Sequence, residues 1–192
     1  MTLLSLSAIG KTFANGTRAL DHLDLDIARG EFVSLLGPSG CGKSTALRII
    51  AGLERADQGK LTWGASKPDI GFVFQDPTLM PWANVFDNVF LPLRLKGISS
   101  AEAQPKIEAA LARVGLADFA QHMPRELSGG MKMRTSIARA LVMQPKLLLM
   151  DEPFAALDEI TRHRLNRDLL SLQAELGMTV IFVTHSVYES AF

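Results

Sequence analysis

The stretch that most restricts how this chain can fold is GPSGCGKST, residues 37 to 45. It follows a short apolar run, EFVSLLG, that indicates a buried strand, and it opens KSTALRIIAGL, which is typical of a helix. A glycine-rich loop in this strand-loop-helix context wraps its backbone N–H groups around phosphate oxygens. The stretch therefore predicts an α/β domain in which Lys43 binds the β- and γ-phosphates and the Ser44 hydroxyl lies on Mg²⁺.

The rest of the pattern alternates strands with helices, which favours a mainly parallel sheet covered on both faces. Before the loop, LLSLSAI and LDHLDLDI alternate apolar and polar residues and indicate half-exposed, antiparallel strands joined by a turn at Asn15-Gly16. Further strands are predicted at ADQGKLTW, DIGFVFQ, PKLLLMDEP and MTVIFVTH. The predicted fold class is α/β, a phosphate-loop core with an N-terminal antiparallel β layer and an inserted α-helical subdomain.

The helical insertion is expected over residues 77–146, between core segments 1–76 and 147–192 of one domain. In it, SSAEAQPKIEAALARVGL begins with serine and an early acidic residue, as helices often do. A later helix, EITRHRLNRDLLSLQAELG, is expected to stop at Gly177, and SVYESAF indicates the start of another. The apolar helix faces are predicted to contain Ile107, Leu111 and Val114 in the first case, and Leu165, Leu169, Leu172 and Leu176 in the second.

Polar side chains are predicted at the carboxyl ends of several core strands. Asp151 and Glu152 end one buried strand, and Gln75 and His185 end two others. Ligands bind at this edge of an open α/β sheet. There, Asp151 can hold Mg²⁺ through water, and Glu152 can orient or deprotonate an attacking water. Taken singly, Gln75 and His185 are more often ordinary strand-end residues, but together with the phosphate loop they indicate a catalytic site.

A second phosphate-binding arrangement is predicted at LSGGM. Ser128 stands in a good N-cap position, and Gly129 and Gly130 follow it at the start of a helix. Free backbone N–H groups and the positive end of a helix dipole make such a terminus suitable for phosphate. One nucleotide does not need two such sites on a single chain.

Composition excludes several classes of protein. Twenty basic residues balance twenty acidic ones, so we expect no nucleic-acid partner held by excess positive charge. The single cysteine, Cys41, permits no internal disulfide and fits a reducing compartment. No stretch approaches the roughly 20 apolar residues that cross a bilayer, and the N-terminus lacks the pattern of a secretion signal. The default expectation is a cytoplasmic protein.

Taken together, these motifs resemble those of the ATP-binding subunit of an ABC transporter. GPSGCGKST matches the phosphate loop of that family, VFQD its glutamine loop, LLLMDEP its magnesium strand with the catalytic glutamate, and VTH its histidine switch. LSGGM resembles the family signature, and AALD resembles the loop that links two nucleotide sites. The resemblance implies an ATPase that binds ATP and Mg²⁺. The residues it assigns to the nucleotide are Phe13, Gly37, Pro38, Ser39, Gly40, Cys41, Gly42, Lys43, Ser44, Thr45, Ser128, Gly129, Gly130 and Asp158.

The resemblance also implies roles for single residues. Glu152, His185, Gln75 and Lys43 would be catalytic, and Ser44, Gln75 and Asp151 would hold the metal. Phe13 would stack on adenine, where the family usually has tyrosine. Two copies would pair head to tail, so that the signature of one holds the γ-phosphate of the other.

Three departures from the family pattern follow. Met131 replaces the usual glutamine of the signature, and Ala156 stands where serine is common. The chain ends at Phe192, seven residues after His185, whereas members of the family usually continue, so we expect a C-terminally truncated domain.

The stretches DPTLMPWANVFDNV and MDEPFAALDEITRHRL resemble the bacterial importers of nitrate, sulfonates, taurine or thiamin-pyrimidine precursors. This implies a membrane permease, a periplasmic or surface solute-binding protein that acts indirectly, and a peripheral position on the cytoplasmic face of the inner membrane. Met80 and Trp82 are the candidates for permease docking, while Val85, Phe86 and Val89 are expected in the core of the subdomain. The alternatives are a non-transport ABC ATPase and an inactive truncated domain. A G protein or nucleotide kinase would leave LSGG unexplained.

Overall fold

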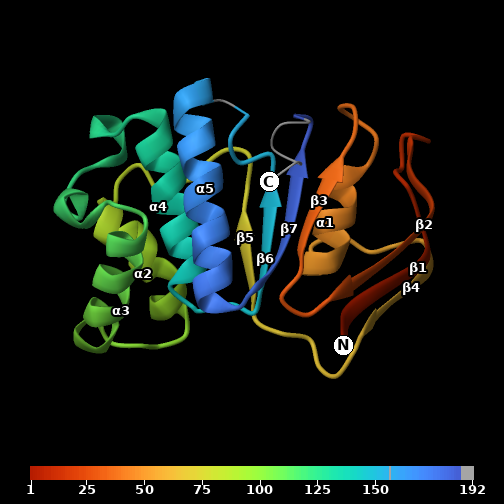
Figure 1. Ribbon diagram of the computed structural model, residues 1–192, viewed down its shortest axis with the longest axis horizontal. Helices are drawn as coiled ribbons and strands as arrows, with labels where there is room; N and C mark the ends of the chain where they lie inside the picture. Colours follow the sequence, from red (N-terminus) through yellow and green to blue (C-terminus); the bar gives the residue numbers. More distant parts are fainter. Residues whose placement is uncertain (156, 187–192) are drawn as a thin grey trace.

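The chain folds into two β-sheets with helices packed between and beside them (Figure 1). A computed structural model describes residues 1–155 and 157–186. The helix expected in SVYESAF after Ser186, and the departure at Ala156, lie outside the described residues. The fold class predicted from the sequence, an α/β phosphate-loop core with an added antiparallel layer, is confirmed.

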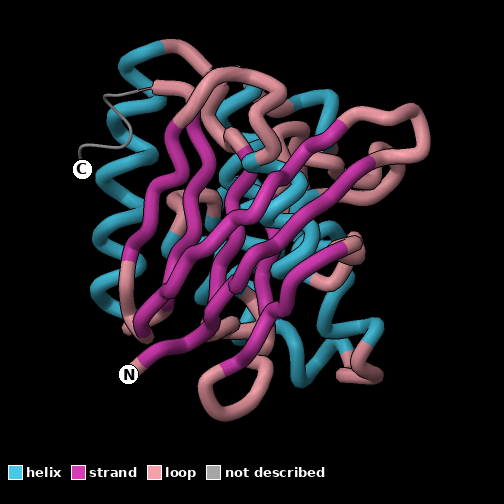
Figure 2. The backbone as a smooth tube through the Cα atoms, turned by 90° about the vertical axis from the view of Figure 1, so that its right-hand side faces the viewer, coloured by secondary structure: helices cyan, strands magenta, loops and turns pink. Residues whose placement is uncertain are grey.

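The antiparallel sheet is built from β1 (Thr2–Thr12), β2 (Arg18–Ala28) and β4 (Gln58–Trp63), in the order β2-β1-β4. Figure 2 views the molecule from the side of this sheet. The predicted turn between the first two strands is present, and the Gly16 N–H donates to the Phe13 carbonyl over 2.9 Å. Alternating apolar residues of these strands face inward, so the predicted antiparallel layer is confirmed.

The parallel sheet has the order β3-β7-β6-β5. Its strands are β3 (Phe32–Leu36), β5 (Ile70–Val73), β6 (Leu147–Asp151) and β7 (Thr179–Thr184). Every residue of the two central strands, β6 and β7, is buried. Helices or the second sheet cover both faces, which explains the continuous apolar runs in the sequence. The carboxyl ends of all four strands meet at the upper edge of the sheet in Figure 1.

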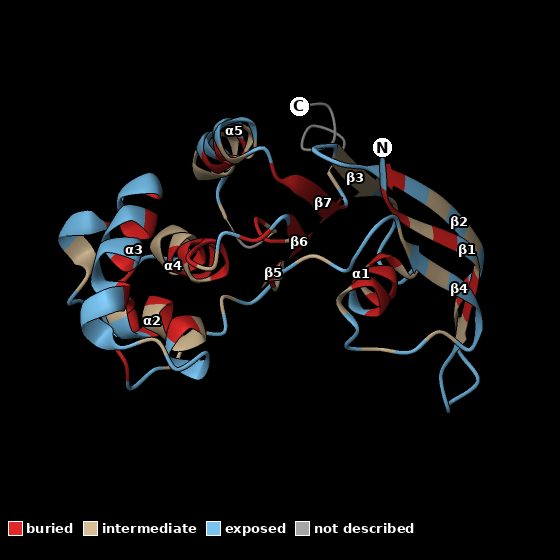
Figure 3. Cartoon of the chain, turned by 90° about the horizontal axis from the view of Figure 1, so that it is seen from below, coloured by how far each residue is buried: buried red, intermediate tan, exposed pale blue. Residues whose placement is uncertain are grey.

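Helix α1 (Lys43–Ala51) fills the space between the two sheets (Figure 3). Its Leu47 and Ile50 are buried in one apolar cluster with Leu4 of β1 and Leu149 of β6. The helix that follows the phosphate loop is therefore fixed on both sides by the core. This packing holds the loop at the carboxyl edge of β3.

The remaining helices lie on the other side of the parallel sheet from α1 and share one apolar cluster with its strands (Figure 3). They are α2 (Val85–Leu95), α3 (Ser100–Arg113), α4 (Gly129–Leu141) and α5 (Glu159–Leu176), with short 3₁₀ turns at Ala117–Phe119 and Pro124–Glu126. Val85 and Val89 are fully buried and Phe86 packs against the same cluster, as expected. Trp82, just before α2, is 77% exposed. Among the described residues, no helix combines the length and apolarity needed to cross a bilayer.

The predicted helix faces are confirmed for α3 and α5. The Ser99 hydroxyl caps α3 by accepting a hydrogen bond from the Glu102 N–H over 3.3 Å. Gly177 ends α5 in the left-handed conformation, with φ of 58°. The buried apolar residues of the two faces are Ile107, Leu111, Val114, Leu165, Leu169 and Leu172, while Leu176 is partly buried.

Candidate nucleotide site

The loop between β3 and α1 leads directly into the helix through a left-handed glycine. Gly42 is the N-cap of α1 and has φ of 96°, which side chains rarely adopt. A Cβ atom built there would lie 2.1 Å from the Ala19 carbonyl oxygen of β2. Only glycine fits this close approach, so the loop and the antiparallel sheet are in direct contact at this point.

Lys43 and Ser44 start α1 and point into the site. The Lys43 ammonium donates to the carbonyls of Gly37 and Pro38 over 2.7 and 2.9 Å. The Ser44 hydroxyl donates to Asp151 Oδ1 over 2.6 Å. The carbonyls of the phosphate loop therefore hold the Lys43 ammonium inside the loop. A serine and a carboxylate, 107 residues apart in sequence, meet at the end of β6.

Glu152 lies between a cation and an imidazole. Its Oε1 is 3.8 Å from Lys43 Nζ, and its Oε2 is 3.4 Å from His185 Nδ1. The Glu152 backbone has φ of 46° and donates its N–H to the Val183 carbonyl over 3.0 Å, which holds the strained residue beside β7. The predicted neighbours of the phosphate loop are thus brought together at one edge of the sheet.

A cavity of about 410 Å³ opens over these groups. Gln75 reaches it from the loop after β5, two residues beyond the end of the strand at Val73. The strand is therefore shorter than the predicted DIGFVFQ, and Gln75 does not end it. Phe13 lines the same cavity from the end of β1, 37% exposed. The lining residues are Phe13, Thr17, Ala19, Ser39, Gly40, Gly42, Lys43, Ser44, Thr45, Gln75 and Glu152.

Thr17 and Ala19 also line the cavity, and no motif in the sequence indicates them. They belong to the turn and strand after Phe13 and reach the cavity because β2 contacts the phosphate loop at Gly42. Their only signal in the sequence is their position just after the Asn15-Gly16 turn. Cys41, in contrast, is exposed, with its Sγ 3.8 Å from Lys43 Nζ.

The oxygen atoms beside the cavity are suitable ligands for a magnesium ion. The Ser44 hydroxyl, the Asp151 carboxylate and the Gln75 amide offer oxygen ligands, which this ion prefers, and phosphate oxygens would complete its shell. Among residues 1–155 and 157–186, no group of three His, Cys, Asp or Glu side chains could hold a metal on its own. The residues present thus suit a metal that arrives with a nucleotide.

The second predicted phosphate site lies apart from this cavity. The Ser128 hydroxyl accepts a hydrogen bond from the Met131 N–H over 3.3 Å, and so caps α4 as predicted. A Cβ atom built on Gly130 would lie 3.0 Å from Thr161 Cγ2 of α5. A Cβ atom built on Gly129 would lie 3.6 Å from Leu157 Cδ2. These residues line the contact between the amino ends of α4 and α5 rather than the cavity that Lys43 faces.

Asp158 caps α5 beside them. Its Oδ1 accepts a hydrogen bond from the Thr161 N–H over 3.0 Å. This bond keeps the pKa of the Asp158 carboxyl below its usual range, because the N–H stabilises the charged form. Neither Asp158 nor the signature residues line the cavity over the phosphate loop.

Comparison with known proteins agrees with this geometry. Residues 20–155 match the profile of the family described as "ABC transporter". The spermidine/putrescine import ATP-binding protein PotA of Marinobacter nauticus is 47% identical over 98% of this chain and 52% of its own length. The PotA protein of Vibrio cholerae is 43% identical, with the same coverage. The chain therefore spans about half the length of the curated relatives it matches.

Solved structures give the same result. The ATP-binding cassette MJ0796, in a dimeric post-hydrolysis state bound to ADP and phosphate, superposes with a TM-score of 0.88 and 36% identity over 98% of this chain and 90% of that one. The protein cbiO1 of Clostridium perfringens, part of the transporter complex cbiONQ, has a TM-score of 0.86 and 31% identity over 96% of this chain and 79% of its own. With the phosphate loop, the acidic strand end and the glycine-started helix in place, this chain belongs to the ABC transporter family.

Proposed function

We propose that this chain binds and hydrolyses ATP, and that it powers the import of a small solute through a separate membrane permease. The observation that carries this proposal is the position of the Glu152 carboxylate, between the Lys43 ammonium and the His185 imidazole beneath the cavity. A carboxylate in this position can accept a proton from a water molecule. The cation beside it can hold the phosphate that the water attacks.

Each residue then has a defined part in hydrolysis. Lys43 exchanges its bonds to two loop carbonyls for bonds to the β- and γ-phosphates. Glu152 accepts a proton as the water oxygen forms a bond to the γ-phosphorus and the bond to the β-phosphate oxygen breaks, so that ADP leaves. His185 orients Glu152 and can donate to the γ-phosphate. Mg²⁺, held by Ser44, Asp151 and Gln75, would supply charge neutralisation on the phosphates.

The separation of the two phosphate sites supports a head-to-tail dimer. Ser128, Gly129 and Gly130 do not line the cavity of their own chain, so they are available to a nucleotide on a second copy. MJ0796, which this chain resembles over 98% of its length, is described as dimeric with ADP and phosphate bound. ATP between the two copies would close the dimer, and its hydrolysis would let the dimer open.

The proposed membrane contact is the segment before α2. Trp82 is 77% exposed and Met80 is half-buried, next to the loop that brings Gln75 to the nucleotide. An exposed tryptophan suits a pocket-filling contact with a short helix of the permease. On this proposal the chain is peripheral, on the cytoplasmic face of the membrane, and a solute-binding protein outside takes part indirectly.

For the cargo we propose a polyamine. The two PotA relatives that share 43–47% identity with this chain are named as spermidine/putrescine importers, which supports a small organic cation. The comparisons give no support to nitrate, sulfonates, taurine or thiamin-pyrimidine precursors, which the stretches around Trp82 and Asp158 had indicated. Uptake of radiolabelled putrescine and of taurine, by cells carrying this chain with its neighbouring permease, distinguishes the two cargo classes. Taurine uptake without putrescine uptake would refute the polyamine assignment.

Hydrolysis is tested with Glu152→Gln, which removes the charge and retains the shape. We expect turnover to fall about 10²–10⁴-fold while ATP binding persists. Near-normal turnover in this variant would exclude Glu152 as the base. A wild-type chain that binds ATP without hydrolysing it would favour the inactive-domain alternative.

The non-transport alternative is tested by co-purification with a polytopic membrane protein. Trp82→Ala should weaken that complex by roughly tenfold or more while leaving ATP binding intact, since hot-spot residues cost about 2 kcal/mol or more when truncated. The docking assignment fails if the complex is unchanged.

A further inference from the structure

One arginine of α4 is bonded to the loop that carries Gln75. The Arg139 guanidinium donates to the Pro77 carbonyl over 2.8 Å and to the Thr78 carbonyl over 2.9 Å. It also donates to the Thr78 hydroxyl over 3.0 Å. The Arg139 side chain thus binds two consecutive backbone carbonyls of the loop. These carbonyls lie 61 and 62 residues before Arg139 in the sequence.

These acceptors are neutral oxygens, and the Arg139 side chain is partly buried. Burial lowers the pKa of Arg139, because a buried site disfavours the charged form. A partly buried cation is costly to leave without hydrogen-bond partners, so the arginine and the loop hold each other in place. The planar fork of arginine is what allows several acceptors to be met at once.

The loop itself is tightly turned. Thr78 has φ of 48°, a left-handed conformation that β-branched residues seldom adopt. Its N–H donates to Asp76 Oδ1 over 3.1 Å. Gln75, immediately before this turn, lines the nucleotide cavity. The bonds from Arg139 therefore hold the loop two and three residues after Gln75.

The same helix begins at the second phosphate site. Gly129 and Gly130 form the first turn of α4, and Arg139 lies near its other end. Helix α4 thus connects the loop that carries Gln75 with the two glycines that are proposed to face a second copy of the chain.

We propose that Arg139 is a positioning residue that holds the Gln75 amide in the nucleotide cavity and ties the Gln75 loop to the helix bearing Gly129 and Gly130. The inference rests on the proposed ATPase function. It assigns no contact between Arg139 and the nucleotide. Its effect on hydrolysis must therefore pass through Gln75.

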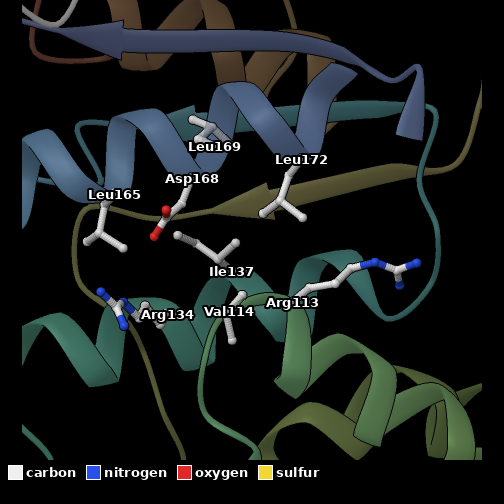
Figure 4. A pocket seen from close by; sticks show the side chains of 8 residues that line it. All are labelled: Arg113, Val114, Arg134, Ile137, Leu165, Asp168, Leu169 and Leu172. Atoms are coloured by element: carbon white, nitrogen blue, oxygen red, sulfur yellow. The ribbon is translucent and has the colours of Figure 1, made fainter. Parts of the chain in front are cut away.

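The test compares Arg139→Lys with a matched control, Arg134→Lys. Lysine keeps the charge but cannot meet both carbonyls with one fork. Arg134 lies on the same helix but points into the groove between α4 and α5, with Val114 and Asp168 nearby (Figure 4). We expect Arg139→Lys to lower the kcat for ATP about tenfold, the equivalent of about 1.4 kcal/mol. The KM should stay within about twofold, and Arg134→Lys should leave both within about twofold.

A double-mutant cycle with Gln75→Ala decides whether the effect passes through Gln75. We expect Gln75→Ala to lower kcat, and Arg139→Lys to cause less than about a twofold further change in that background. Equal losses in both backgrounds would show a purely structural role and overturn the inference. Unchanged ATP turnover in the Gln75→Ala variant would also overturn the inference. A wild-type chain without ATP turnover would instead refute the proposed function, and the inference with it.

A readout without nucleotide covers the case in which Arg139→Lys folds poorly. Thr78→Ala removes one acceptor from the exposed side of the loop and leaves α4 untouched. Both Thr78→Ala and Arg139→Lys should speed hydrogen exchange of the amides of residues 75–79 by about tenfold, with α4 still protected. Unchanged exchange in residues 75–79 for both variants would overturn the inference.

Discussion

Replacing Gly42 by alanine should destabilise the chain far more than the same change two residues earlier, at Gly40. Gly42 has φ of 96°, and a Cβ atom there would lie 2.1 Å from the Ala19 carbonyl oxygen. Real Cβ contacts are essentially never under 3.0 Å, so β2 and the loop would have to separate by roughly 1 Å. Left-handed strain costs about 1–3 kcal/mol, and overpacking of a rigid backbone contact costs about 1–3 kcal/mol more.

Gly40 is the matched control. Its φ of 81° is also left-handed, but a Cβ atom there would meet nothing within 4 Å. Gly40→Ala should therefore lose only the free energy that corresponds to backbone strain. Gly42→Ala should lower the free energy of unfolding by about 1–3 kcal/mol more than Gly40→Ala does. The free energies of unfolding in urea, measured without nucleotide, give the comparison directly. Equal destabilisation by the two variants would refute the steric argument and indicate that the loop relaxes freely away from β2.

Two further predictions concern the signature and the antiparallel sheet. In a Glu152→Gln background with ATP, Gly130→Asp should abolish dimer formation in sizing experiments, because its carboxylate would face the partner's γ-phosphate. Met131→Gln should preserve the dimer, since one neutral hydrogen bond is worth on the order of 1 kcal/mol; the opposite pattern would refute the account of the two glycines. The pKa of the Asp57 carboxyl lies below its usual range, because the Thr12 N–H and then the Lys11 ammonium donate to it. A depressed pKa contributes stability above about pH 4 that is lost as the pH falls through the lower folded value. Asp57→Asn should therefore reduce the loss in the free energy of unfolding as the pH is lowered below about 4. An unchanged pH dependence of that free energy would show that Asp57 does not contribute to it.

Much of the nucleotide site was predictable because its motifs are local in sequence. Lys43 and Ser44 follow their glycines directly, and the buried strand before Asp151 can be recognised from its apolar run alone. The sequence also predicts that Glu152 and His185 end core strands. It does not contain the order of the strands, and it is the pairing of β6 with β7 that brings these two side chains to 3.4 Å.

The features that were not predicted depend on distant neighbours. Arg139 stands in an ordinary helical pattern, and its acceptors are backbone carbonyls about 60 residues away, which leave no mark on the sequence. Helix α2 was not predicted from its irregular, apolar stretch. Pro92 lies inside the helix, and tertiary packing of buried residues such as Val89 outweighs the cost of the lost hydrogen bond.

The strand order of the parallel sheet also affects how the chain can fold. Val33 of β3 pairs with Ile181 of β7, 148 residues further along, and β7 lies between β3 and β6. Closing a loop of that length costs about 4 kcal/mol of chain entropy by the logarithmic rule, before any contact compensates it. Such non-local pairing slows folding and leaves apolar strands exposed while it proceeds. During synthesis, β3 and β6 emerge well before the strand that separates them. The phosphate loop can therefore reach its final position only after residues 179–184 have been made.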